Sequence, residues 1–184
     1  MKTEKEKMLA GEAYLATDPQ LTADRRQAKK ACQLINQGDY DDEAGRNAQL
    51  AALINFQGSF YVEPPLYVDY GYNILVGDNF YANHGLTILD GARVVMGKNV
   101  FIAPNVVIST AGHPLDKVRR AAGEEFVKPI TLGDDVWLGA HVTLCPGVTI
   151  GNNVVVGAGS VVVHDLPDNS VCVGTPARPV KSLA

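Results

Sequence analysis

The sequence has no long hydrophobic run, few aromatic residues, three cysteines and no excess of basic charge. Without such a run we expect no transmembrane helix. A formal net charge of −4 argues against a broad nucleic-acid footprint or a basic membrane-binding patch. The charged stretch from Met1 to Lys7 lacks the apolar core of a secretory signal. The cysteines lie far apart without a CxxC pair, which favours free thiols and a cytoplasmic location.

What the 184 residues do contain is a six-residue repeat. From Leu132 to Val162 an aliphatic residue stands at every sixth position, glycine often follows it, and a second aliphatic row lies four positions on. Neither an α-helix nor an alternating strand requires a period of six. A solenoid of short, flat strands does, because each unit forms one face of a coil. The two rows are Leu132, Leu138, Leu144, Ile150, Val156 and Val162, and Val136, Val142, Val148 and Val154.

The first 57 residues have helical rather than six-residue periodicity. Thr3 and Glu6 fit a capping box, and Gly38 is placed to end a helix in the left-handed conformation. We expect this segment to be a helical cap that closes one end of the solenoid, where an open coil would expose strand edges. The expected helices run from about Thr3 to Gly11, Thr22 to Gln37 and Asp42 to Asn55.

Residues 58–184 are predicted to form the solenoid itself. Its rhythm slips by two residues between Ile88 and Met96, and residue pairs that tolerate positive φ, such as Asp78-Asn79 and Asn152-Asn153, fill the expected corners. The rhythm is interrupted at length by a loop over residues 109–129. Long insertions in repeat proteins often form the binding face, so this loop is a candidate for function. The tail, 165–184, has too many prolines for another regular coil.

The repeat and several longer segments resemble the maltose and galactoside O-acetyltransferases. The resemblance covers essentially the whole chain and implies a left-handed parallel β-helix, an exception to the right-handed crossover rule. The leader Thr3-Glu4-Lys5-Glu6-Lys7-Met8 and the Gly112-His113-Pro114 loop are its most specific parts. Other matching segments include Glu63-Pro64-Pro65, Phe80-Tyr81-Ala82-Asn83, Val136-Trp137-Leu138-Gly139 and Gly174-Thr175-Pro176-Ala177-Arg178.

Acetylation of a hydroxyl requires a base, and histidine titrates in the right range. On local grounds His84 and His141 are corner residues, and His164 lies where the repeat ends. His113 stands at the mouth of the long loop, and the residues alone leave its role open. The resemblance implies that His113 is the catalytic base of a direct transfer from acetyl-CoA, without an acyl-enzyme. Cys145 is a weaker candidate nucleophile, because its repeat position normally holds a small buried residue.

The resemblance also implies the residues that contact the two substrates. Asn83 is expected near the acetyl group and the acceptor sugar, as a donor to the oxyanion, although a corner asparagine fits equally well on local grounds. Asp69, Asp90 and Glu125 match acceptor-side positions, and Asp18 of the leader is a further candidate in an uncertain alignment. At Asp69 the galactoside enzymes carry serine, which moves this chain toward the maltose enzymes.

Coenzyme A is expected in a groove between adjacent subunits of a homotrimer, with no metal, nucleic acid or membrane as a partner. Arg178 and Lys181 supply charge for phosphate. Val163-His164 replaces the Thr-Lys pair of relatives, and Trp137 has ordinary packing as its alternative. The matching positions are Trp137, Gly139, Ala140, Ala158, Val163, His164, Arg178 and Lys181.

Three other functions compete with a sugar acetyltransferase. A related acetyltransferase acting on an antibiotic or on serine is disfavoured by the leader from Thr3 to Gly11. A zinc carbonic anhydrase with this solenoid requires convergent histidines, and His113 and His141 have no near partner in the sequence. A non-catalytic solenoid is disfavoured by an intact His113 loop together with Arg178.

Overall fold

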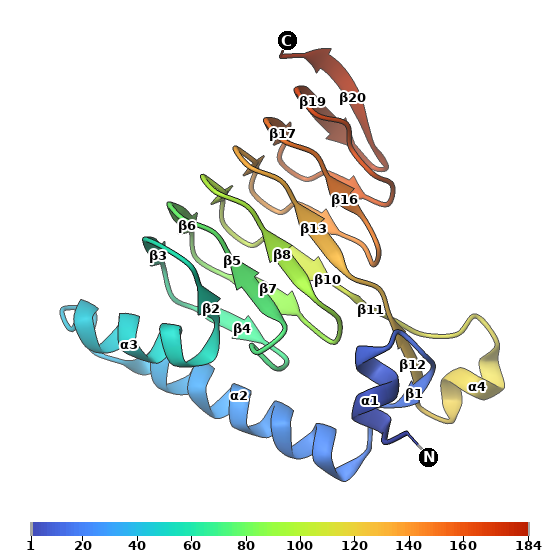
Figure 1. Ribbon diagram of the computed structural model, residues 1–184. Helices are drawn as coiled ribbons and strands as arrows, with labels where there is room; N and C mark the ends of the chain where they lie inside the picture. Colours follow the sequence, from blue (N-terminus) through green and yellow to red (C-terminus); the bar gives the residue numbers. More distant parts are fainter. Residues whose placement is uncertain (1, 184) are drawn as a thin grey trace.

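The computed structural model describes residues 2–183 and is a left-handed parallel β-helix, as predicted (Figure 1). Three sheets form the faces of a prism, and all their strands are parallel except β20, which pairs antiparallel at the edge of face II. Face I contains β2 (Asn55–Phe56), β5 (Ile74–Val76), β8 (Val94–Met96), β13 (Ile130–Leu132) and β16 (Thr149–Ile150). Face II contains β3 (Phe60–Val62), β6 (Phe80–Ala82), β9 (Phe101–Ile102), β14 (Trp137–Leu138), β17 (Val154–Val156), β19 (Ser170–Gly174) and β20 (Ala177–Ser182). Face III contains β4 (Leu66–Val68), β7 (Leu86–Leu89), β10 (Val107–Ser109), β15 (Thr143–Leu144) and β18 (Val161–Val162).

The aliphatic rows of the repeat form the core of this prism. Leu132, Leu138 and Leu144 come from three different faces, and each is at most 1% exposed. Because residues of one strand alternate between inside and outside, the residue between two buried positions is left on the outer surface. The repeats bury their apolar rows only by stacking, which makes the solenoid one cooperative unit.

The corners carry the residues expected there. Asn79, Asn99 and Asp135 all have positive φ, which asparagine and aspartate tolerate better than most residues. Their side chains form a ladder: Asn79 donates to Asn99 over 2.9 Å, and Asn99 donates to Asp135 over 2.7 Å. The corner residues therefore link successive coils as well as turning the chain.

One corner is wider in the early coils than in the late ones. Ala82 pairs with Ile102, twenty residues on, whereas Leu138 pairs with Val156, eighteen residues on. The two extra residues lie between faces III and I, where Asp90 to Arg93 connect β7 to β8. This corner explains the slip predicted between Ile88 and Met96. The long interruption at 109–129 leaves the solenoid at the same corner, one coil later.

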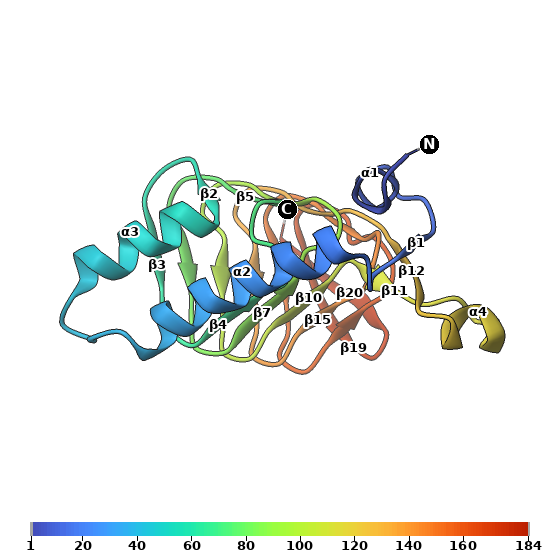
Figure 2. The same cartoon turned by 90° about the horizontal axis from the view of Figure 1, so that it is seen from below.

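The cap consists of α1 (Glu4–Leu9), α2 (Pro19–Gln37) and α3 (Glu43–Leu53). Helices α2 and α3 lie across the open end of the first coil, as expected of a cap (Figure 2). Three details differ from the prediction. Helix α2 starts earlier, because Asp18 caps it and Pro19 occupies its first turn. Gly38 has φ −65° and is not left-handed. The first solenoid strand begins at Asn55, ahead of the predicted boundary at 58.

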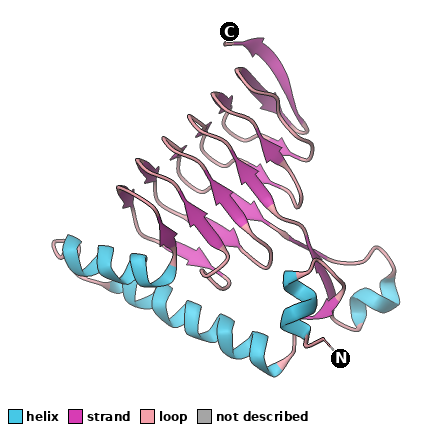
Figure 3. Ribbon diagram, in the orientation of Figure 1, coloured by secondary structure: helices cyan, strands magenta, loops and turns pink. Residues whose placement is uncertain are grey.

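The leader does more than cover the coil end. Its strand β1 (Tyr14–Leu15) pairs antiparallel with β12 (Glu124–Val127), which also pairs with β11 (Ala111–Gly112) (Figure 3). The interruption at 109–129 is thus an ordered excursion that also contains α4 (Lys117–Ala121). Nothing in the sequence analysis anticipated this three-stranded sheet, which joins residues 111 positions apart, Tyr14 and Glu125.

The tail is more regular than its prolines suggested. Leu166 forms a bridge with Ile150, and β19 pairs in parallel with β17 before turning back as β20. The prediction that the coil stops at 165 is therefore wrong for residues 166–174. The prolines lie outside β19 and leave its backbone free to bond. No helix within residues 2–183 is long and apolar enough to span a membrane.

Candidate active site

Two edges of the prism carry the residues of interest. The wide edge joins face III to face I and comprises residues 69–73, 89–93, 109–129, 145–147 and 163–165. The narrow edge joins face II to face III and comprises residues 63–65, 83–85, 103–105, 139–141 and 157–159. Backbone hydrogen bonds stack the narrow corners, for example from Asn105 to His84, from His141 to Pro104 and from Gly159 to Ala140.

His113 lies on the wide edge at the start of the excursion, with its side chain 52% exposed. Its Nδ1 is 3.2 Å from the carbonyl oxygen of Glu124. A carbonyl only accepts, so Nδ1 must carry the proton, and in the neutral ring Nε2 is then the free acceptor. Nε2 lies 3.8 Å from Oε1 of Glu125, beyond direct hydrogen-bond reach. The fold therefore presents Nε2 as an available base beside a carboxylate.

Glu125 is in turn held by the leader. The Tyr14 hydroxyl donates to Oε2 of Glu125 over 2.8 Å, and Tyr14 is only 3% exposed. Burial, followed by the bond to Glu125, raises the pKa of Tyr14 well above its ordinary value, so the phenol remains a donor. The two oxygens of one carboxylate thus face different partners, Tyr14 on one side and His113 on the other.

A cavity of about 190 Å³ opens next to this carboxylate. Glu125 and Asp69, two of the predicted acceptor-side residues, line it, and the side-chain carboxylate of Asp69 makes no hydrogen bond within residues 2–183. Burial raises the pKa of Asp69, and the nearby cations Lys29 and Arg25 oppose that shift. The sequence analysis missed Tyr14, Arg25 and Lys29, which also line the cavity. The one signal in the sequence was the four-residue spacing of Arg25 and Lys29, which places them on the same face of α2.

Two of the predicted acceptor residues lie outside this cavity. Asp90 is completely buried, and its carboxylate accepts three backbone N–H groups, from Asp69 (3.1 Å), Tyr70 (2.8 Å) and Gly71 (2.7 Å). An acceptor molecule cannot reach this buried carboxylate. Asp90 was predicted to contact the acceptor, but in the structure it holds the backbone of the wide edge instead. Asp18 accepts from two backbone N–H groups as the N-cap of α2. Ala16 and Gly91 line the cavity in their place.

The narrow edge holds the expected donor Asn83 and much of the expected coenzyme track. Asn83 is half-buried, and its side-chain oxygen accepts from the His84 amide over 2.7 Å, so its NH₂ group is left to donate. Gly139 is buried, and a Cβ there would lie 2.6 Å from the Ala158 nitrogen. The close stacking of the coils is therefore sufficient to explain why position 139 is a glycine. Ala140 and Ala158 lie on the same edge, half-buried and exposed respectively.

Face II adds an exposed aromatic column to this edge. Trp137 is 54% exposed and lies in register with Phe101 of the preceding coil. Tyr61 and Tyr81 continue the column, with ring centroids 6.1 Å apart and nearly parallel planes. The alternative for Trp137 was ordinary packing in the core. Within this chain its side chain is too exposed for that. An exposed aromatic surface of this kind is typical of a ligand or protein contact.

The other expected coenzyme residues lie at the C-terminal end. Val163 and His164 are exposed on the wide edge, and Arg178 and Lys181 are exposed on β20. A guanidinium N–H of Arg178 donates to the carbonyl of Ala177 over 2.9 Å. Both cations remain accessible to an anion.

One chain does not bring the two halves of the expected site together. Asn83 precedes β7, and the wide edge begins after β7 ends at Leu89. The four residues of this strand span roughly 13 Å, so the donor and His113 lie at opposite margins of face III. A small reacting group cannot contact both within a single chain.

Cys145 has the wrong environment for a nucleophile, because burial raises the pKa of its thiol and keeps it protonated. Within residues 2–183 no group of three His, Cys, Asp or Glu side chains is arranged to hold a metal ion.

Comparison with known proteins defines the class. Residues 7–55 match the maltose acetyltransferase hexapeptide capping motif, and residues 129–164 match the bacterial transferase hexapeptide repeat. The galactoside O-acetyltransferase of Escherichia coli is 52% identical over 123 residues, 67% of this chain and 61% of that protein. A putative acetyltransferase of Saccharomyces cerevisiae is 48% identical over 180 residues, 97% of this chain and 92% of that protein.

Solved structures agree over the full length. A maltose O-acetyltransferase from Clostridium difficile superposes with a TM-score of 0.98 at 46% identity, covering 100% of this chain and 98% of that one. A galactoside acetyltransferase in complex with coenzyme A superposes with a TM-score of 0.96 at 39% identity, covering 100% of this chain and 92% of that one. Fold and repeat thus define a hexapeptide-repeat acetyltransferase. Within that class, the chain belongs to the maltose/galactoside O-acetyltransferase family.

Proposed function

We propose that this protein transfers the acetyl group of acetyl-CoA to a sugar hydroxyl, with His113 as the general base. The observation that carries the proposal is the contact of His113 Nδ1 with the Glu124 carbonyl over 3.2 Å. In the neutral imidazole this contact leaves Nε2 as the acceptor nitrogen, beside Glu125, which lines a cavity together with Asp69. Asp69 and Glu125 supply acceptors for the sugar hydroxyls in that cavity.

The reaction proceeds as a direct transfer. The acceptor O–H gives its proton to Nε2 as its oxygen attacks the thioester carbonyl, and the tetrahedral intermediate carries the negative charge. When this intermediate collapses, the C–S bond breaks and the Nε2–H protonates the departing thiolate. Glu124 holds the Nδ1–H throughout, so the imidazole keeps its orientation in both protonation states. The side-chain NH₂ of Asn83 is a suitable donor to the oxyanion.

We further propose that a second copy completes the site within a homotrimer. Asn83 lies across face III from His113, and the exposed Trp137 lies beyond it on face II, so the donor that meets His113 must come from an adjacent subunit. Coenzyme A then lies between copies, along Gly139, Ala140 and Ala158. Val163, His164, Arg178 and Lys181 contact its far end, the two cations through its phosphates.

Thiol release from acetyl-CoA, measured with maltose, glucose, a galactoside, serine and an aminoglycoside, tests the proposal. We expect activity with the sugars only, and a loss of roughly 10²–10⁴-fold in kcat for His113→Asn. His141→Asn is the matched control, because His141 is exposed and asparagine tolerates its positive φ of 59°. Wild-type turnover by His113→Asn would refute the base, and turnover of serine or the aminoglycoside alone would refute the acceptor class.

A further inference from the structure

The leader strand and His113 are connected through two adjacent residues of the excursion. In the β1–β12 pairing, Leu15 stands opposite Glu124 and Tyr14 stands opposite Glu125. Glu124 contacts Nδ1 of the imidazole through its carbonyl, and Glu125 faces Nε2 through its carboxylate. A strand of two residues near the N-terminus thus lies against both residues that flank the imidazole.

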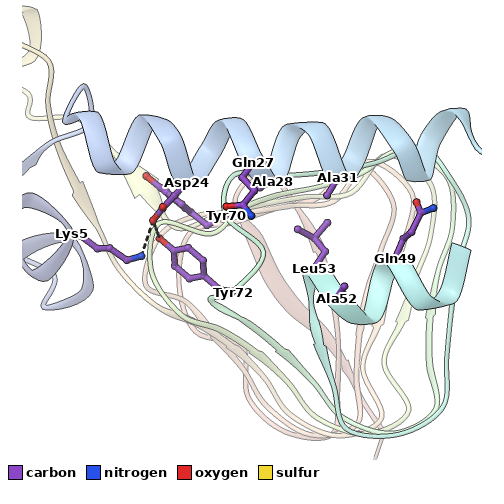
Figure 4. A pocket seen from close by; sticks show the side chains of 10 residues that line it. All are labelled: Lys5, Asp24, Gln27, Ala28, Ala31, Gln49, Ala52, Leu53, Tyr70 and Tyr72. Carbon is purple, nitrogen blue, oxygen red and sulfur yellow. Dashed lines mark hydrogen bonds and ion pairs between the residues drawn. The ribbon is translucent and has the colours of Figure 1, made fainter. Parts of the chain in front are cut away.

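The leader is itself firmly anchored. The Leu15 amide donates to the Glu4 carboxylate over 2.7 Å, which ties β1 to α1. Lys5 of α1 pairs with Asp24 of α2 over 2.7 Å, and Tyr72 donates to the same carboxylate over 3.1 Å (Figure 4). Met8 is fully buried beside Tyr14 in a small second core. Tyr14 is therefore held from behind as well as through its hydroxyl.

The distance from Glu125 to Nε2 has a chemical meaning. At 3.8 Å the carboxylate cannot accept a direct hydrogen bond from a protonated Nε2, although a small rotation about its side chain would bring it there. Such an ion pair would hold a proton on Nε2 and occupy the space that the acceptor hydroxyl needs. The bond from Tyr14 to Oε2 opposes that rotation.

We propose that Tyr14 is a positioning residue that tethers Glu125 away from His113, which keeps Nε2 free as a base and leaves room for the acceptor hydroxyl. The proposal rests on the function proposed above and adds a role for the leader. Tyr14 also lines the proposed acceptor cavity, but its hydroxyl is bonded to Glu125, and the role proposed here is exercised through that carboxylate.

The Tyr14→Phe variant tests it, because phenylalanine keeps the buried ring and removes only the hydroxyl. Near pH 7 we expect kcat/KM to fall about tenfold. The acidic limb of the kcat/KM profile should move to higher pH, so that activity recovers to within about threefold of wild type near pH 9. A role confined to folding would lower activity by the same factor at every pH, and that result would overturn the proposal.

Tyr72→Phe is the matched control. It removes the same kind of bond, from a tyrosine to a carboxylate, at the anchor on α2, and it should leave the profile unchanged. A double-mutant cycle supplies a second test. In a Glu125→Gln background no charge remains to pair with His113, so Tyr14→Phe should cause no further shift. An equal shift in both backgrounds would show that Tyr14 does not act through Glu125.

The single variant Glu125→Gln keeps the test decisive if Tyr14→Phe folds poorly. Removing the negative charge beside Nε2 should move the acidic limb to lower pH, and no movement would overturn the proposal. Failure of the proposed function is distinguishable, because full activity of His113→Asn would remove the base itself, whereas the outcomes above concern only its surroundings.

Discussion

Raising the pH from about 4 to about 7 is expected to destabilise the folded chain through Asp90. Burial raises the pKa of this carboxyl from 3.8 to about 6, and the backbone N–H groups of Tyr70 and Gly71 offset only part of that shift. Between these two values the folded protein retains a proton that the unfolded chain has released. The stability contribution is therefore present at low pH and is lost as the pH rises through this window.

The magnitude follows from the size of the shift. About two pH units correspond to about 3 kcal/mol of unfolding free energy, and for a chain of this length to a change of roughly 6–12 °C in Tm. Asp90→Asn removes the titration, so the difference in unfolding free energy between wild type and variant should decrease by about 3 kcal/mol over the window. Urea unfolding at one fixed protein concentration measures it, because the stability of the proposed homotrimer would depend on concentration.

Asp41→Asn is the control, because Asp41 is exposed in the turn before α3 and its carboxylate has no hydrogen-bond partner within residues 2–183. Its difference from wild type should not vary with pH. If the Asp90→Asn difference also stays constant, the reasoning is refuted. The three backbone N–H groups would then keep Asp90 ionised at all these pH values, and hydrogen bonding rather than burial would dominate the corner.

Three further predictions concern the narrow edge and the aromatic column. Gly139→Ala should destabilise the fold by about 1–3 kcal/mol, measured as Tm, because its Cβ would meet the Ala158 nitrogen at 2.6 Å; an unchanged Tm would show that the coils have room to separate. Trp137→Ala should raise KM for acetyl-CoA about tenfold while leaving KM for the sugar unchanged, and the reverse pattern would place Trp137 on the acceptor. Asn83→Ala should lower kcat by about 10²-fold or more, and a change in KM alone would contradict the proposed role of Asn83 as the oxyanion donor.

The solenoid is readable from the sequence because its cause is local. Every sixth residue must be aliphatic to fill a triangular core, and corners accept asparagine, aspartate and glycine at positive φ. The same local logic identified the widened corner as a slip between Ile88 and Met96. It failed at the tail, where proline content was weighed more heavily than the apolar residues Leu166 and Cys172 that continue the core.

The site was only partly readable. His113 could be singled out because it stands where the repeat fails, and its proposed chemistry came from a resemblance. Asp90 was misplaced because a carboxylate beside a loop looks the same in sequence whether it faces a ligand or holds three backbone amides. Asp18 presents the same ambiguity, because its carboxylate caps α2 and a helix N-cap and a ligand contact look alike in sequence.

The sequence by itself determined the six-residue period, the helical cap and the position of the excursion, because each depends on residues close together in the chain. Only the tertiary structure decided which nitrogen of His113 is free and what holds Glu125. The contact of His113 with Glu124 depends on β11 pairing with β12 within the excursion, whereas the bond that holds Glu125 depends on β1 pairing with β12 across more than a hundred residues. No local pattern specifies the β1–β12 pairing. The tertiary structure also separated Asn83 from His113 across face III, because folding fixes which edge of the prism each corner occupies.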